Sequence, residues 1–353
     1  MLIITEFNPK HGRCSLIIES AEDLWTLRRL ISKGDVIVTR SSRVVKNDGE
    51  FTRPDKGERI KVTIALSVED VRLDSSVERV RVKGSIVEAS DESVSKTGTH
   101  AITLSPGHPL TIKKERWTPL EQKLIRSSTE FSRRYVVVAV DRREAGVGVL
   151  SGSHLSLVTT IESGLGGKMS EEQSSKPYIS KVAEVVVQST NAGDEIIVAG
   201  PGNFKNALVN ELKERLRSTR IWPLEGLDTT GADGVRSLVK NPAFQDVAKG
   251  SMLVDMQRLV SEVVRRVSAS DSKVAYSLPR VKEAAAAGAV EACAVSDDVF
   301  ATGLDEEDLV HVLNTIEDRG GSVYLADSSL EFGKQVSAFG GIVALLRYPF
   351  RAS

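Results

Sequence analysis

Three acidic residues near the N-terminus have types and spacing that could activate water. Glu19, Glu22 and Asp23 cluster at the start of a predicted helix. Clustered carboxylates can hold a divalent metal cation whose bound water cleaves phosphodiesters. The same acids can instead cap the helix and interact favourably with its dipole. We prefer capping, because no histidine or further acid completes a recognisable site, and keep the metal site as the alternative.

A second set of residues is suited to binding nucleic acid. Residues 40–61 contain seven basic and four acidic side chains around the turn sequence Asn47-Asp-Gly49. Basic side chains on a turn between two strands can reach RNA phosphates, and Phe51 could stack on a base. The alternative is a solvated hairpin tip of mixed charge.

Residues 163–178 are glycine-rich at one end, polar throughout, and placed between a strand pattern and a helix pattern. They include Gly166, Gly167, Lys168 and Lys176. A long unstructured loop is uncommon inside a compact domain, which favours a role in contacting a partner or RNA over a simple connection. Downstream, Gly200-Pro-Gly202 lacks the P-loop pattern and predicts only a tight turn from strand to helix.

The remaining polar residues form no recognisable catalytic motif. The five histidines are scattered without metal-ligand spacing, and no nucleophile elbow is present. Asp297-Asp298 and Asp305-Glu-Glu-Asp308 give the last part of the chain an acidic edge. This edge could meet a basic protein surface, and the second group also suits the N-terminus of a helix.

The composition is that of an ordinary globular protein with more than one domain. The chain has 353 residues, 41% of them hydrophobic and 27% charged, and a net charge of −1. We expect no membrane segment and no signal peptide. The two cysteines, Cys14 and Cys293, predict neither a disulfide framework nor a zinc knuckle, and a reducing cytoplasm fits best.

Three regions must position these candidate residues. Residues 1–130 predict alternating strands with one helix after Ser20 and a connecting helix at 116–132. Residues 131–250 predict an α/β domain whose first strand, 133–141, is covered on both faces. Residues 251–353 predict a third, compact α/β domain. Its expected strands are 290–295, 322–325 and 342–346.

Four segments, in their order and spacing, resemble the Pelota family, the archaeal and eukaryotic paralogues of the class I translation release factor. They are Asp23–Asp35, Val138–Ala145, Ala199-Gly-Pro-Gly-Asn-Phe-Lys205 and Phe339–Tyr348. The resemblance covers essentially the whole chain, and its short ends look archaeal. A release factor carries its Gly-Gly-Gln hydrolysis loop within the segment matching 163–178. This chain has Gly166-Gly167-Lys168 there, without the glutamine that would position water.

The resemblance implies an N-terminal Sm-like β-barrel, a central release-factor-like α/β domain and a C-terminal ribosomal-protein-like α/β domain. It implies binding in the A site of stalled ribosomes, delivery by a GTPase related to elongation factor one alpha, and subunit splitting with an ABC-type recycling ATPase. The segment 163–178 matches the place where the family contacts its GTPase. The residues that match the family's decoding-centre loop are Arg40, Arg43, Lys46, Arg53, Lys56 and Arg59.

We therefore expect a monomeric cytoplasmic ribosome-rescue factor in mRNA surveillance that acts by binding and leaves peptidyl-tRNA intact. The alternative is a divalent-metal-dependent endoribonuclease that cleaves mRNA on stalled ribosomes in no-go decay. In that case Glu19, Glu22 and Asp23 would be the catalytic or metal-binding residues. The binding role itself needs no cofactor.

Overall fold

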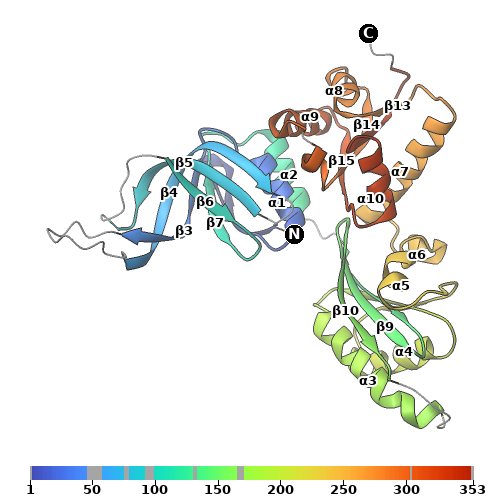
Figure 1. Ribbon diagram of the computed structural model, residues 1–353. Helices are drawn as coiled ribbons and strands as arrows, with labels where there is room; N and C mark the ends of the chain where they lie inside the picture. Colours follow the sequence, from blue (N-terminus) through green and yellow to red (C-terminus); the bar gives the residue numbers. More distant parts are fainter. Residues whose placement is uncertain are drawn as a thin grey trace. The chain divides into compact units, whose positions relative to one another are not determined.

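A computed structural model describes residues 2–45, 58–74, 79–91, 99–129, 133–164, 171–302 and 304–350 (Figure 1). The chain divides into two compact units. The first unit combines Met1–Glu130 with Phe300–Gly320, and the second combines Phe131–Val299 with Gly321–Ser353. No helix in the described part of the chain is long and apolar enough to span a membrane.

The first unit is built on a seven-stranded antiparallel sheet with the strand order β1-β2-β7-β3-β4-β5-β6. Its strands are β1 (Ile3–Asn8), β2 (Arg13–Ile17), β3 (Val36–Val45), β4 (Glu58–Asp74), β5 (Arg79–Ala89), β6 (Thr99–Leu104) and β7 (Pro109–Lys113). Strand β5 shows why these residues form a sheet, since Val80 and Val82 are buried while Arg81 and Lys83 are exposed. The helices of this unit are η1 (Pro9–His11), α1 (Ala21–Leu30), α2 (Pro119–Thr129) and α9 (Glu306–Asp318).

The second unit begins with a five-stranded sheet of order β10-β9-β8-β11-β12, in which β8, β11 and β12 run parallel. All six residues of β8 are buried, because helices cover both faces of the sheet. Helices α3 and α4 cover one face and α5 covers the other. The elements are β8 (Tyr135–Val140), β9 (Glu144–Ser151), β10 (His154–Glu162), α3 (Glu171–Ser189), β11 (Glu195–Ala199), α4 (Phe204–Arg215), β12 (Ile221–Leu224), α5 (Gly231–Leu238) and α6 (Pro242–Val247).

A four-stranded sheet of order β13-β16-β14-β15 completes the second unit. Helix α7 buries an apolar stripe that includes Met256, Leu259 and Val263. This stripe joins a core that runs from Tyr135 of β8 to Val343 of β16. The elements are α7 (Met252–Ser268), β13 (Val274–Tyr276), α8 (Leu278–Ala286), β14 (Val290–Ser296), β15 (Ser322–Ala326), α10 (Glu331–Ala338) and β16 (Ile342–Leu346), with η3 (Val299–Thr302) after β14.

One prediction about the elements is wrong in its extent. The loop predicted over 163–178 ends early, because α3 begins at Glu171 and continues through Pro177. A proline favours a break, but its fixed φ angle suits a helix and it removes a single backbone hydrogen bond. The helix predicted from Tyr178 is therefore the continuation of a longer one.

Candidate nucleic-acid interface

The predicted RNA-binding segment lies on a two-stranded ribbon at one end of β3 and β4. Strand β3 pairs with β7 over Val36–Thr39, and then residues 40–45 continue past this pairing alongside residues 58–63 of β4. We call residues 40–45 and 58–63 the ribbon. In Figure 1 the ends of β3 and β4 project away from the helices of the first unit. A projecting ribbon of this kind can enter a groove of a larger particle.

The register of the ribbon gathers basic residues. Arg40 is paired with Thr63 and Lys61 with Ser42, which places Arg40 and Lys61 on the same face. Both side chains are exposed and have no ion-pair partner within the described residues. Arg43 and Arg59 occupy the same ladder, opposite Ile60 and Val44. Exposed cations without an ion-pair partner, such as Arg40 and Lys61, can bind phosphate groups.

The structure does not place every predicted ribbon residue. Lys46, Arg53 and Lys56 lie outside the described residues, between the two ends of the ribbon. The structure describes only the base of this predicted hairpin, which includes Arg40 and Lys61. Lys61, which the resemblance did not assign, is added to the candidate surface by its register.

The predicted acidic cluster caps α1. The carboxylate of Asp23 is 4% exposed and accepts hydrogen bonds from the backbone N–H groups of Glu19 and Ser20, at 3.0 and 2.9 Å. Glu19 is exposed, and Glu22 lies in the first turn of α1. The described residues hold no group of three or more His, Cys, Asp or Glu side chains placed for a metal ion. Asp23 therefore has the capping role that its position predicts, with one carboxylate oxygen accepting from two backbone donors.

The segment predicted to contact a partner, residues 163–178, begins after β10, close to the turns that follow β8 and β11. Gly166, Gly167 and Lys168 lie outside the described residues, and Lys176 is exposed on α3. At the start of the loop, the N–H of Ser163 donates to the carbonyl of Arg143 in the turn after β8, at 2.7 Å. The carboxyl ends of β8 and β11 lie side by side, so the loop begins near the turn at 200–202.

The turn after β11 requires glycine at its first position. Gly200 has a φ of +140°, and a Cβ there would lie 1.9 Å from the carbonyl oxygen of Val140. Lys205, in the first turn of α4, is 2% exposed. Its Nζ donates a hydrogen bond to the Leu224 carbonyl at 3.2 Å and forms an ion pair with Glu225 at 2.5 Å. Lys205 therefore ties α4 to the end of β12. The sequence could not show this role, since a lysine in a helix usually faces solvent.

Two arginines in α1, one buried and one partly buried, were not identified from the sequence. Arg28 is 3% exposed and pairs with Glu306 and Glu307, and Arg29 pairs with Glu317. Trp25 stacks on Phe300 with ring centroids 5.1 Å apart. Part of the acidic segment at 305–308 therefore pairs with basic residues of its own unit. Asp305 itself caps α9, accepting from the N–H of Asp308 at 2.8 Å.

The other acidic pair sits in a network at the end of β14. Asp297 accepts from the Ser328 N–H at 3.0 Å, and burial close to Asp327 and Asp298 raises the pKa of its carboxyl. The Asp327 carboxylate lies 3.0 Å from Nδ1 of His154. Burial works to raise the pKa of Asp327, but the nearby His154 and the hydrogen bond from the Ser329 N–H outweigh it and hold that pKa below its usual value.

Comparison with known proteins gives a consistent pattern along the chain. The family model of the Pelota N-terminal domain matches residues 1–129, that of eRF1 domain 2 matches 134–249, and that of eRF1 domain 3 matches 253–350. These matches, in this order, confirm the predicted fold class of a β domain followed by two α/β domains.

Whole-length relatives agree with the domain matches. The chain is 34% identical over 337 residues to the protein pelota homolog of Nitrosopumilus maritimus, covering 95% of this chain and 96% of that one. It is 30% identical to the homologue of Pyrococcus horikoshii, covering 99% of both chains. The crystal structure of the Thermoplasma acidophilum Pelota protein is similar in fold, with a TM-score of 0.65 and 20% identity over 99% of this chain and 100% of that one.

Proposed function

Since this chain belongs to the Pelota family, we propose that it is a ribosome-rescue factor in mRNA surveillance. It recognises stalled ribosomes in the A site, acts with an elongation-factor-like GTPase, and promotes dissociation of the subunits without releasing the peptide. It works in the cytoplasm, where translating ribosomes are found. The observation that carries this proposal is the pair of exposed basic residues on the ribbon, Arg40 and Lys61, in a chain otherwise built like a release factor.

Binding through the ribbon explains how the protein engages RNA without a catalytic centre. Arg40 and Lys61 offer unpaired positive charge, and phosphate contacts of this kind position a protein on RNA without reading sequence. Residues Arg43, Lys46, Arg53, Lys56 and Arg59 extend this set in our proposal. The affinity then depends on salt, because each phosphate contact releases counterions.

The second part of the proposal is that the peptide stays attached. Hydrolysis by a release factor requires the glutamine of Gly-Gly-Gln, and position 168 is lysine in this chain. Lysine presents a cation that cannot align a neutral water in the same way, since it lacks a hydrogen-bond acceptor. The segment around Gly166, Gly167, Lys168 and Lys176 is proposed instead to contact the GTPase.

The partners follow from what other family members are described with. A ribosome-bound archaeal Pelota is described together with ABCE1. Dom34 of S. cerevisiae is described as interacting with Hbs1. For this chain we propose the same two classes of partner, an ABC-type ATPase and a translational GTPase, with the ribosome as the platform.

The alternative, a metal-dependent endoribonuclease using Glu19, Glu22 and Asp23, is tested by removing the acids. Asp23→Asn retains a hydrogen-bond acceptor for the cap, and Glu22→Gln removes a second charge. If either change abolished metal-dependent cleavage of ribosome-bound mRNA while ribosome binding persisted, the nuclease would replace rescue by binding as the main function. We expect no such cleavage from the unaltered chain, because Asp23 is engaged by two backbone donors.

The proposal is tested by binding to ribosomes stalled with an empty A site. The full chain, added with its GTPase and a non-hydrolysable GTP analogue, should cosediment with these ribosomes. It should be displaced when the A site is filled by aminoacyl-tRNA. Equal binding to ribosomes with filled and empty A sites would contradict the proposal.

A further inference from the structure

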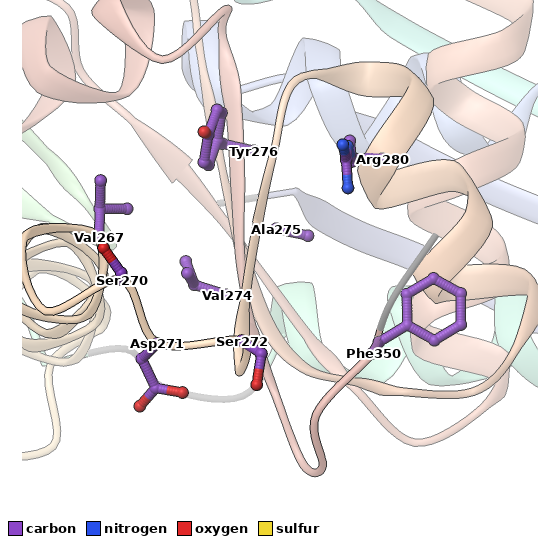
Figure 2. A pocket seen from close by; sticks show the side chains of 9 residues that line it. All are labelled: Val267, Ser270, Asp271, Ser272, Val274, Ala275, Tyr276, Arg280 and Phe350. Carbon is purple, nitrogen blue, oxygen red and sulfur yellow. The ribbon is translucent and has the colours of Figure 1, made fainter. Parts of the chain in front are cut away.

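The edge of the C-terminal sheet carries a groove that the proposed function does not use. A cavity of about 520 Å³ surrounds β13, the edge strand of its sheet. It is lined by residues from the end of α7 to the start of α8, and also by Phe350. Figure 2 shows Val274 and Tyr276 on one side of the strand, toward Val267, and Ala275 on the other side, toward Arg280 and Phe350.

The backbone of β13 is oriented to accept another strand. The Ser277 N–H donates to the carbonyl of Ile342, and the Leu346 N–H donates to the carbonyl of Lys273. In an antiparallel ladder these bonds alternate, so Val274 and Tyr276 direct their N–H and C=O groups away from β16. An edge that presents both donors and acceptors is a template for an added strand.

The groove also presents apolar surface and charge. Tyr276 is 46% exposed, which is high for a large aromatic side chain in a strand. Arg280 on α8 is exposed and has no ion-pair partner within the described part of the chain. The neighbouring Asp271 is already occupied, since it accepts the N–H of Lys273 at 2.9 Å. Arg280 is therefore the cation that remains available to a ligand.

The groove offers one positive charge that the protein itself does not use. Two of the residues that line it are charged, Asp271 and Arg280. The Asp271 carboxylate accepts the N–H of Lys273, whereas Arg280 faces the solvent. An arginine beside open backbone groups favours a ligand that brings a carboxylate of its own.

We propose that β13 and Arg280 form a docking site for an acidic, extended peptide segment of a partner protein, added as a fifth strand to this sheet. An RNA strand would fit less well, because phosphates accept hydrogen bonds but cannot donate to the outward carbonyls of Val274 and Tyr276. A peptide supplies both donors and acceptors. An apolar residue of the peptide covers Tyr276, and an acidic residue of the peptide pairs with Arg280.

The backbone on either side of β13 supports this assignment. Ser270 and Ser277 have φ angles of +52° and +66°, and they are the two non-glycine residues with positive φ in the described chain. Such conformations are strained for serine, and strain of this kind gathers at binding sites. Here it fixes the two ends of a three-residue strand.

The experiment measures binding of a labelled peptide of alternating valine and glutamate to the full chain by fluorescence anisotropy. Two control peptides are matched in length: one with lysine in place of glutamate, and one with N-methylated backbone amides. We expect the glutamate peptide to bind at least about tenfold more tightly than either control. In amide exchange, its binding should protect the N–H groups of Val274 and Tyr276.

Variants distinguish binding that depends on the groove from binding that depends on the overall charge of the protein. Arg280→Glu and Arg280→Gln should weaken binding, the first by at least about tenfold. Lys334→Glu changes the net charge as much as Arg280→Glu, at an exposed position of α10, and should bind like the unaltered chain. An equal loss of peptide affinity in Lys334→Glu and Arg280→Glu would overturn the proposal. Absence of binding by the glutamate peptide, or Arg280-dependent binding of single-stranded RNA in its place, would also overturn it. No ribosome is present, so the result is independent of the rescue assay.

Discussion

At the scale of single residues, the buried arginine in α1 joins this helix to the acidic residues of α9. Arg28 is 3% exposed and is neutralised by Glu306 and Glu307. Arg28→Ala leaves the partly buried carboxylate of Glu306 without its ion-pair partner, so we expect a loss of about 3 kcal/mol in the free energy of unfolding. Urea unfolding followed by the fluorescence of Trp25 measures it.

A double-mutant cycle assigns this loss to the ion pair. The cycle combines Arg28→Ala with Glu306→Gln. If the two changes acted independently, with no coupling energy between them, Arg28 would contribute through packing alone.

Two aspartates near the end of β14 should respond to pH in opposite directions. The pKa of Asp297 is raised by burial, so its ionised form at neutral pH destabilises the fold. Asp297→Asn should raise the melting temperature at pH 7, and the gain should disappear as pH falls to the ordinary carboxyl range.

Burial raises the pKa of Asp327, but the nearby His154 and the hydrogen bond from Ser329 outweigh it, so that this pKa is lowered. Its stabilisation is present above the unfolded pKa and is lost as pH falls through the folded pKa. Asp327→Asn should therefore lower the melting temperature at pH 7, with a difference that shrinks in acid. Thermal unfolding of both variants between pH 3 and pH 7, at roughly unit steps around the carboxyl pKa, is the check. The same sign of change at pH 7 in both would contradict this account.

At the scale of elements, the ribbon should account for the salt dependence of ribosome binding. Arg40 and Lys61 are exposed and share one face of the ribbon. Replacing both with alanine should weaken binding and reduce the slope of log K against log salt by about 1.5, because two phosphate contacts are lost. Titration of ribosome binding against potassium chloride measures the slope.

The matched control removes the same number of positive charges from positions outside the ribbon. Lys10 and Lys123 are exposed basic residues of the same unit, on η1 and α2. Their joint replacement by alanine should leave the slope unchanged. An equal change in both double variants would show that net charge, rather than the ribbon, controls binding.

The turn after β11 depends on the absence of a side chain. Gly200→Ala would place a Cβ 1.9 Å from the Val140 carbonyl oxygen at a positive φ, so we expect a loss of at least ~2 kcal/mol. Gly193→Ala is the control, because Gly193 also has a positive φ but no atom within 4 Å of the position that its new methyl group would take. It should lose only about 1 kcal/mol. Equal losses in chemical denaturation would mean that the close contact has no effect.

Element prediction from the sequence succeeded where periodicity is strong and failed where it is short. The alternating valines of β5 and the all-buried run of β8 are visible in the sequence and were predicted correctly. Strand β13 has three residues, too few for a period to appear, and it was missed. The loop predicted over 163–178 was too long, because α3 begins at Glu171.

Sites were harder to predict than elements, because they depend on partners distant in sequence. The capping role of Asp23 could be predicted from its three-residue spacing to Ser20. The pairing of Arg28 with Glu306 joins positions 278 residues apart, and no local pattern predicts it. Lys61 entered the candidate surface only through the register of β3 and β4.

At the scale of the whole molecule, the chain combines a Pelota N-terminal domain with two domains that match those of eRF1. Position 168 is lysine, where hydrolysis by a release factor would need glutamine. The central claim of our proposal is therefore that the subunits of stalled ribosomes are separated while the nascent chain stays on its tRNA. In this proposal, binding energy and the partner ATPase drive the separation, without a catalytic side chain of this protein.

The most direct test is a sucrose-gradient assay on stalled ribosomes carrying labelled peptidyl-tRNA and labelled mRNA. The chain is added with its GTPase, GTP and the recycling ATPase, and the two subunits, the peptide and the mRNA are followed together. We predict separated subunits with intact peptidyl-tRNA and intact mRNA, and much less separation with the Arg40→Ala/Lys61→Ala variant. Release of free peptide, or cleaved mRNA without separation of the subunits, would contradict the account.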